Sequence, residues 1–298
     1  MGNRLVCYVV AIAVILVWST TFVATKVLLS ALTPVEIMFY RYVLAYLVLL
    51  AAYPEFHRPV DVREEFLFAG AGFFGGTLYF LTENYALKHT LASNVGLLLA
   101  ASPMLTALLA RFFTERKKFG RNLWLGLVVA FAGVFLVIFN GHVVLGLRPF
   151  GDFLALGAAF SWALYSILIK KIGTRHAAAY TTRKVFFYSL LTMIPTLFFM
   201  DFRWDISILC DRITIGNLLF LGVIASSVCF LLWSKVIWRL GPVAVNNFIY
   251  LVPLFTMVFS AIALGEPVTI YAVAGGVLIL SGVCLSSRGT LENSRASD

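Results

Sequence analysis

The sequence has little charge for its length. Of its 298 residues, 23 are Lys or Arg and 14 are Asp or Glu, so charged residues make up 12% of the chain and hydrophobic residues 61%. A soluble globular protein is roughly a quarter charged and about half apolar. So few charges do not cover the surface of a water-soluble fold, whereas a lipid bilayer favours apolar positions. The composition therefore excludes a soluble domain and predicts an integral membrane protein.

Residues that support catalysis or metal binding are also scarce. The four cysteines form no C-x-x-C pair and show no metal-ligand spacing, and the four histidines stand far apart along the chain. The sequence contains no H-E-x-x-H, no G-x-S-x-G and no Walker A motif. We therefore expect no catalytic residues, no metal site, no cofactor and no direct drive by ATP. A membrane-embedded enzyme stays open as an alternative.

Long apolar runs recur along the chain with short connections, several of which carry Pro or Gly. A helix needs about 20 mostly apolar residues to cross the hydrocarbon core. Strands of a membrane barrel would instead alternate over about ten residues, and these runs are longer and do not alternate. The sequence therefore predicts an all-α protein with ten transmembrane helices. The predicted spans are 5–29, 35–53, 66–87, 91–113, 121–140, 151–169, 184–200, 213–238, 243–264 and 268–287.

The positions of Lys and Arg predict the orientation. The formal net charge of +9 arises largely from the gaps between apolar runs, which argues against nucleic acid as a partner. With the N-terminus inside, the inner segments hold 15 of the 23 Lys and Arg residues and the outer segments hold 4. Cytoplasmic loops are enriched in these residues. We therefore expect both termini in the cytoplasm of a bacterium, with the protein in the plasma (inner) membrane.

The two halves of the chain share an ordered set of residues. The matches, first half before second, are Trp18 and Lys26 with Trp162 and Lys170, Pro103, Thr106 and Glu115 with Pro253, Thr256 and Glu266, and Gly126 and Gly133 with Gly275 and Gly282. Each half has five spans, an odd number, so the second half enters the membrane inverted. We predict one five-helix repeat over 1–145, an inverted repeat over 146–288 and a polar tail over 289–298. Inverted repeats are a common basis of alternating access in secondary transporters.

Further residues extend these matches to a known family. They are Trp18-Ser19 with Lys26, Arg41, Ala86-Leu87, Pro103 and Glu115, Ser161-Trp162-Ala163 with Lys170-Lys171, and Pro253 with Gly265-Glu266. With them the sequence resembles the drug/metabolite transporter superfamily, in its EamA-type ten-helix branch, over essentially the whole chain. The resemblance implies two five-helix halves around a central cavity and transport of amino acids, metabolites or drugs. One departure is Thr114 before Glu115, where the second half has Gly265.

Aromatic and amide side chains within the spans are candidates for substrate binding. A ring with a polar edge suits a solute that has an apolar body and a polar head. Ordinary helix packing or an interfacial aromatic belt is the alternative for each of them. The candidates are Trp18, Phe22, Tyr79, Glu83, Asn94, Trp162, Tyr165, Trp233, Asn247 and Tyr250.

Glu83 is also the candidate for ion coupling. An ionisable group within a span is costly, so it usually faces a cavity or a partner. Glu83 follows Tyr79 by four residues and shares its helix face, which suits a substrate amine or a coupled proton. The alternative is a position near the outer end of the span, where Glu83 is solvated or pairs with Lys88.

Other residues are candidates for structural roles. Pro103 and Pro253 each remove a helical hydrogen bond and are candidate hinges. Glu115 and Glu266 end equivalent helices, and we expect them to accept backbone N–H groups of the next helix. We also have expectations for three cations. Lys26 extends to the outer interface or holds an anionic substrate group, and Lys235 extends to the inner interface. Arg41 pairs with Glu36 or with a helix terminus.

These observations predict a secondary transporter that works by alternating access. The expected activity is export of small organic solutes such as amino acids or related metabolites. The expected partners are the solute, the lipid bilayer and a coupled proton, and the expected assembly is a monomer or a weak homodimer. A solute channel is a further alternative, although no filter loop is visible in the sequence.

Overall fold

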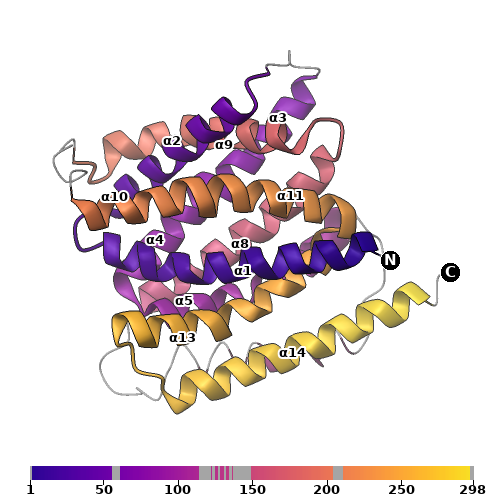
Figure 1. Ribbon diagram of the computed structural model, residues 1–298. Helices are drawn as coiled ribbons and strands as arrows, with labels where there is room; N and C mark the ends of the chain where they lie inside the picture. Colours follow the sequence, from indigo (N-terminus) through magenta and orange to yellow (C-terminus); the bar gives the residue numbers. More distant parts are fainter. Residues whose placement is uncertain are drawn as a thin grey trace.

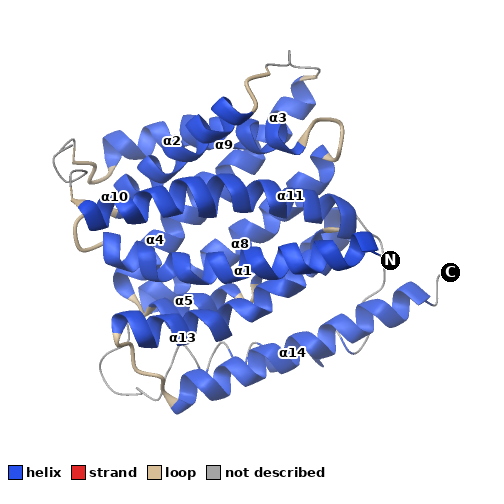
Figure 2. Ribbon diagram, viewed as in Figure 1, coloured by secondary structure: helices blue, strands red, loops and turns tan. Residues whose placement is uncertain are grey.

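The computed structural model describes residues 2–55, 61–113, 122, 125–126, 128–130, 132–133, 136, 149–203 and 211–295. These residues form helices joined by short connections, and no strand occurs among them (Figure 2). The helices run roughly parallel or antiparallel to one another, and α1 begins at the same end of the bundle at which α14 finishes (Figure 1). An even number of crossings requires that arrangement. The prediction of an all-helical fold is confirmed.

The first half contributes seven described elements. They are α1 (Gly2–Leu28), α2 (Pro34–Ala52), α3 (Val62–Gly72), the π-helical η1 (Phe73–Leu78), α4 (Tyr79–His89), α5 (Ala92–Leu99) and α6 (Ser102–Phe113). The elements α3, η1 and α4 follow one another without a gap and form the third predicted span. Helices α5 and α6 form the fourth. The fifth predicted span, 121–140, lies mostly outside the described residues.

The second half follows the same plan. Its elements are α8 (Pro149–Ile172), α9 (Ala178–Phe199), α10 (Arg212–Leu219), the π-helical η3 (Phe220–Val228), α11 (Cys229–Leu240), α12 (Pro242–Asn246), the 3-10 helix η4 (Asn247–Leu251), α13 (Val252–Leu264) and α14 (Ile270–Arg295). Six of the described helical stretches are long and apolar enough to cross a membrane: Arg4–Leu28, Pro34–Ala52, Ala92–Ala110, Pro149–Ile172, Arg212–Leu240 and Pro242–Leu264.

Two helices extend beyond the predicted spans. Helix α9 begins at Ala178, before the predicted span at 184–200, and the charges in its first turns find partners: Lys184 donates to the Glu65 carboxylate, and Arg183 donates to backbone carbonyls after α2. Paired charges do not need to lie outside the helix. The tenth helix continues to Arg295, beyond the predicted end at 287, and no proline stops it.

Local sequence signals explain several helix ends. Thr33 accepts a hydrogen bond from the Glu36 N–H and Glu36 accepts one from the Thr33 N–H, so a capping box precedes α2, with Pro34 in the first turn. At the end of α13, Gly265 has a φ of 66°, a left-handed conformation that glycine adopts without a steric penalty.

The interruptions of the long helices recur in both halves. The π-helical segment η1 begins at Phe73 and η3 begins at Phe220, 147 residues later. Helix α2 packs against η3, and α9, the second helix of the other half, packs against η1. Each half therefore braces the irregular segment of the other, as an inverted repeat predicts.

The matched glycines bring the fifth and tenth predicted spans into backbone contact. A Cβ atom built on Gly133 lies 2.6 Å from the Gly275 carbonyl oxygen, and one built on Gly282 lies 2.4 Å from the Ala130 nitrogen. Glycines two turns apart on one face allow such an approach. The repeated glycine pairs therefore mark a helix crossing.

We expect Gly282→Ala to lower the free energy of unfolding by about 1–3 kcal/mol, because a methyl group at this crossing must push two backbones apart. Thermal unfolding of the purified protein in detergent measures the effect. Gly216→Ala is the matched control, since Gly216 is also helical and a Cβ there meets nothing within 4 Å. Equal melting temperatures for the two variants would contradict the assignment of the crossing.

Candidate functional site

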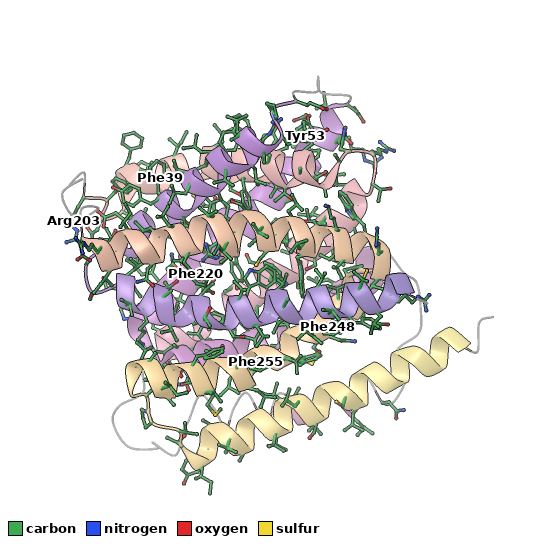
Figure 3. All side chains as sticks on the ribbon, viewed as in Figure 1. Phe39, Tyr53, Arg203, Phe220, Phe248 and Phe255 are labelled. Atoms are coloured by element: carbon green, nitrogen blue, oxygen red, sulfur yellow. The ribbon has the colours of Figure 1, made fainter. Side chains whose placement is uncertain are left out.

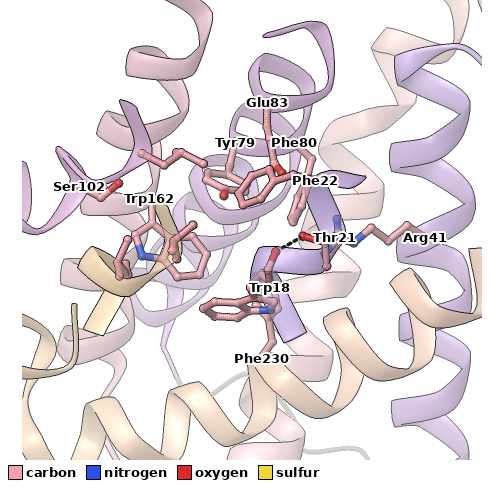
Figure 4. Close-up of a pocket in the computed structure, with 13 residues that line it drawn as sticks. Trp18, Thr21, Phe22, Arg41, Tyr79, Phe80, Glu83, Ser102, Trp162 and Phe230 are labelled. Atoms are coloured by element: carbon pink, nitrogen blue, oxygen red, sulfur yellow. Dashed lines mark hydrogen bonds between the residues drawn. The ribbon is translucent and has the colours of Figure 1, made fainter. Parts of the chain in front are cut away.

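A small cavity lies between the two halves of the bundle. Side chains fill most of the interior of the bundle (Figure 3). In this view Arg203 marks the left end of the bundle and Tyr53 its upper right. The cavity has a volume of about 40 Å³, which is room for a few water molecules. Its lining residues are Trp18, Thr21, Phe22, Arg41, Tyr79, Phe80, Glu83, Leu99, Ser102, Trp162, Phe230, Ile249 and Val252 (Figure 4). Pockets for drug-sized ligands measure roughly 300–1,000 Å³, so this cavity must widen to hold a solute.

The helix interruptions supply matching parts of the cavity wall. Leu99 and Ser102 flank the break between α5 and α6, and Ile249 and Val252 lie 150 residues later, at the junction of η4 and α13. Broken helices at membrane depth are tolerated where they are buried or line a cavity. Equivalent breaks in the two halves therefore line the cavity from both sides.

Aromatic rings from both halves meet at the cavity. The Trp18 and Trp162 rings, which are repeat equivalents, meet edge to face with centroids 5.2 Å apart. Phe230 of α11 contacts both rings, at 5.5 and 5.7 Å, and Tyr79 lies 5.2 Å from Trp162. Trp18 is fixed by a hydrogen bond from its indole N–H to the Ala225 carbonyl of η3, at 2.9 Å. These rings form an apolar wall of defined shape.

Glu83 is buried in this wall. Its side chain is 1% exposed and its Oε2 atom has no hydrogen-bond partner. Tyr79, which lies one turn earlier on α4, also lines the cavity. Lys88 is exposed, and within the described part of the chain it forms no ion pair with Glu83. The alternative of a solvated or Lys88-paired carboxylate is therefore wrong, because five further residues of α4 separate Glu83 from the helix end at His89.

Arg41 is the second buried charge at the cavity, and its predicted pairing with Glu36 is wrong. Glu36 instead accepts from the backbone N–H of Arg203 at 2.7 Å and pairs with the Arg203 guanidinium at 3.7 Å. The Arg41 Nε donates to Ser226 of η3 at 2.6 Å, and its guanidinium lies 4.1 Å from the Phe80 ring centre. Its Nη1 atom is buried without a hydrogen-bond partner. Because Glu36 caps α2, it faces the end of the bundle and not Arg41.

The family model for the EamA-like transporter family matches the chain twice, over residues 5–139 and 149–288. The chain belongs to the EamA-like transporter family. It is accordingly a multi-pass membrane transporter, and the resemblance read from the sequence is confirmed. The two matches follow one another in the same order as the predicted repeats.

Relatives and a solved structure agree with this assignment. An uncharacterized transporter of Archaeoglobus fulgidus is 28% identical over 279 residues, which cover 91% of this chain and 94% of that protein. A probable amino-acid metabolite efflux pump of Salmonella typhimurium is 29% identical and covers 94% of each chain. A probable terminal-alkyne amino-acid exporter of Streptantibioticus cattleyicolor is 24% identical, over 94% of this chain and 93% of that one. A crystal structure with 18% identity shares the fold, with a TM-score of 0.65 over 94% of this chain and 98% of that chain.

Half of the ten candidate binding residues of this EamA-like transporter line the cavity: Trp18, Phe22, Tyr79, Glu83 and Trp162. Tyr165 and Trp233 lie behind the wall, where they contact Trp162 and Trp18 at 5.1 and 4.8 Å. Asn94, Asn247 and Tyr250 are not among the lining residues. Asn247 and Tyr250 lie in the 3-10 turn η4, which directs side chains differently from an α-helix, and Asn94 lies in the first turn of α5.

The asparagine next to the candidate Asn247 has a structural role. Asn246 is fully buried, whereas Asn247 is partly exposed, and Asn246 joins three helices. It accepts from the Trp162 indole at 3.4 Å and donates to Thr106 at 2.9 Å and to Ser166 at 3.1 Å. The polar partners at 106, 162 and 166 were visible in the sequence, but the helical register of the ninth span was not.

Glu266 has a structural role in the transporter, although not with the predicted helix. It accepts from the backbone N–H groups of Ala92 and Ser93, at 2.9 and 3.1 Å, and pairs with Lys26 at 3.7 Å. These N–H groups begin α5, whose own N-cap position is Leu91 and offers no side-chain cap. Lys26 therefore does not extend freely to the interface. Glu115 lies outside the described residues.

The two prolines stand at helix starts. Pro103 lies in the first turn of α6 and Pro253 in the first turn of α13, each after an interruption. A proline in the first turn removes no helical hydrogen bond. The predicted loss of a bond within a continuous helix is therefore wrong. Their role as hinges stays a prediction, and the adjoining breaks are the points where movement would occur.

We expect Glu266→Ala to lower the free energy of unfolding by about 1–3 kcal/mol, because two buried N–H groups of α5 lose their acceptor. Glu266→Gln keeps one acceptor oxygen and should fall between this variant and the wild type. Tryptophan fluorescence during thermal unfolding in detergent measures both variants. A wild-type melting temperature for Glu266→Ala would show that the cap does not stabilise the fold.

Proposed function

We propose that the protein is a secondary transporter that exports small organic solutes, such as amino acids or related metabolites, by alternating access. The observation that carries this proposal is the position of the cavity. Its wall comes from equivalent interruptions in two inverted halves. Two related bundles of this kind have two packings of similar free energy, one open to each side. The similarity to a probable amino-acid metabolite efflux pump of Salmonella and to a probable amino-acid exporter of Streptantibioticus supports an exporter with an amino-acid solute.

The small volume of the cavity is consistent with a cycle that includes a closed state. The cavity has a volume of about 40 Å³, and its charged and aromatic lining residues enclose it closely. Opening toward either compartment would require the aromatic wall to part on one side. The breaks beside Pro103 and Pro253 and the π-helical segments η1 and η3 are the irregular points at which the helices can bend.

Glu83 is the proposed site of proton coupling. An ionised carboxylate in the cavity attracts a cationic group of the solute, whereas protonation removes that attraction. The ionisable neighbours of Glu83 are Arg41 and Tyr79. A proton that enters from a more acidic exterior would release the solute outward, and loss of the proton to the cytoplasm would allow the next solute to bind.

The setting we propose is the bacterial inner membrane, with both termini in the cytoplasm. The excess of Lys and Arg in the inner segments supports this orientation. A single chain contains both halves of the cavity, so a monomer, or a weak homodimer of complete units, suffices for transport.

We expect Glu83→Gln to slow proton-driven efflux of amino acids about ten- to hundredfold, because the amide offers neither the charge nor the exchangeable proton. The measurement is efflux of labelled amino acids from proteoliposomes, with and without a pH gradient that is acid outside. Wild-type efflux should accelerate with the gradient, and efflux by the variant should not respond to it.

Asp211→Asn is the matched control for Glu83→Gln. Asp211 caps α10 by accepting from the Thr214 N–H at 2.8 Å, and asparagine caps helices equally well. This variant should keep the wild-type response to the gradient. A Glu83→Gln variant with an undiminished pH response would remove Glu83 from the coupling step.

A further inference from the structure

Two opposite charges line the same buried cavity without forming an ion pair. Arg41 is 2% exposed and Glu83 is 1% exposed. No nitrogen of the Arg41 guanidinium lies within 4.0 Å of a Glu83 carboxylate oxygen, so these two described residues form no ion pair. Burial of a charge is costly unless a partner compensates it. Two opposite charges that line one small cavity without touching are placed to contact a group that lies between them.

The buried atoms that have no hydrogen-bond partner indicate the chemistry of that group. The Arg41 Nη1 has hydrogens to donate and no acceptor, and the Glu83 Oε2 is an acceptor with no donor. The first atom fits a carboxylate and the second fits an ammonium group. A molecule that carries both groups would satisfy both atoms together.

The Arg41 guanidinium is held in place for such a contact. Its Nε is bound to Ser226, and the group lies over the Phe80 ring. These two contacts come from η3 and α4 and fix the plane of the guanidinium while Nη1 stays without a partner. A buried donor such as Nη1 usually has a hydrogen-bond acceptor within the protein.

The rest of the wall is apolar and aromatic. In the close-up, Trp162 lies on the side of the cavity away from Arg41, with Trp18 and Phe230 below (Figure 4). A solute whose charged groups lie at Arg41 and Glu83 would therefore direct its remaining part toward these rings. Rings of this kind favour an apolar or aromatic side chain.

We propose that Arg41 and Glu83 form a clamp for the two charged groups of a zwitterionic solute, an α-amino acid with an apolar or aromatic side chain. Arg41 binds the carboxylate and Glu83 binds the ammonium group. This inference rests on the proposed transport function and adds Arg41 as a residue that determines specificity. It also excludes a simple organic cation as the preferred solute, because Arg41 repels a cation that has no carboxylate.

Three probes that differ only in their charged groups test the clamp. They are L-phenylalanine, phenethylamine, which lacks the carboxylate, and 3-phenylpropionate, which lacks the ammonium group. Their binding to the purified wild-type transporter is measured by competition against labelled L-phenylalanine, and L-leucine is included as an apolar reference. The clamp predicts that removal of either group weakens binding about tenfold or more.

The variants assign each group to its residue. Arg41→Gln should erase the preference for phenylalanine over phenethylamine while the preference over 3-phenylpropionate remains. Glu83→Gln should do the reverse. Arg203→Gln is the control, since Arg203 pairs with Glu36 outside the cavity, with a side chain that is 55% exposed. It should leave both preferences unchanged. A merely structural Arg41 would lower binding of all probes by the same factor.

The outcomes separate the clamp from the transport function. If the wild type binds the three probes equally, a bridging water or another group satisfies the two charges and the clamp is wrong, and this result needs no variant to fold. If amino acids are transported and the preferences persist in Arg41→Gln, the clamp is wrong and the transport function stands. Failure of the wild type to transport any solute from a broad panel would instead overturn the proposed function.

Discussion

The absence of water from the bilayer core is the constraint on which this structure depends. Backbone N–H and C=O groups at that depth must bond within the protein, so the chain forms long helices. Helix association there relies on close packing and not on the hydrophobic effect, which explains the contact of Gly282 with the Ala130 backbone. The same constraint confines irregular backbone to places where other helices brace it, as α2 braces η3 and α9 braces η1.

The irregular segments and the cavity belong together for the same reason. A broken helix leaves backbone groups without their usual partners, and only a polar or enclosed site accommodates them. Leu99 and Ser102 at one break and Ile249 and Val252 at the other line the cavity, while η3 supplies the carbonyl that fixes Trp18 and the hydroxyl that fixes Arg41. The segments that are least regular therefore position the residues we propose to bind the solute.

Two sets of charged side chains differ in their partners. Three ion pairs join distant segments of the chain: Lys26 with Glu266, Lys184 with Glu65, and Arg203 with Glu36. Glu266, in the connection after α13, also caps α5. Arg41 and Glu83, which line the cavity, are kept apart from each other. This contrast supports a structural role for the first group and a ligand-binding role for the second.

The sequence by itself determined the membrane class, the helical fold, the family, the repeat and five of the residues at the cavity, because composition, run length and matched spacing are local properties of the chain. The tertiary structure alone decided which groups the buried charges contact. Arg41 faces Ser226 and Glu266 caps Ala92, partners that are 185 and 174 residues away. It also decided that Asn246 and not Asn247 is buried, since η4 changes the helical register there. Such long-range pairings and local departures from the α-helix leave no periodic signal in a single sequence.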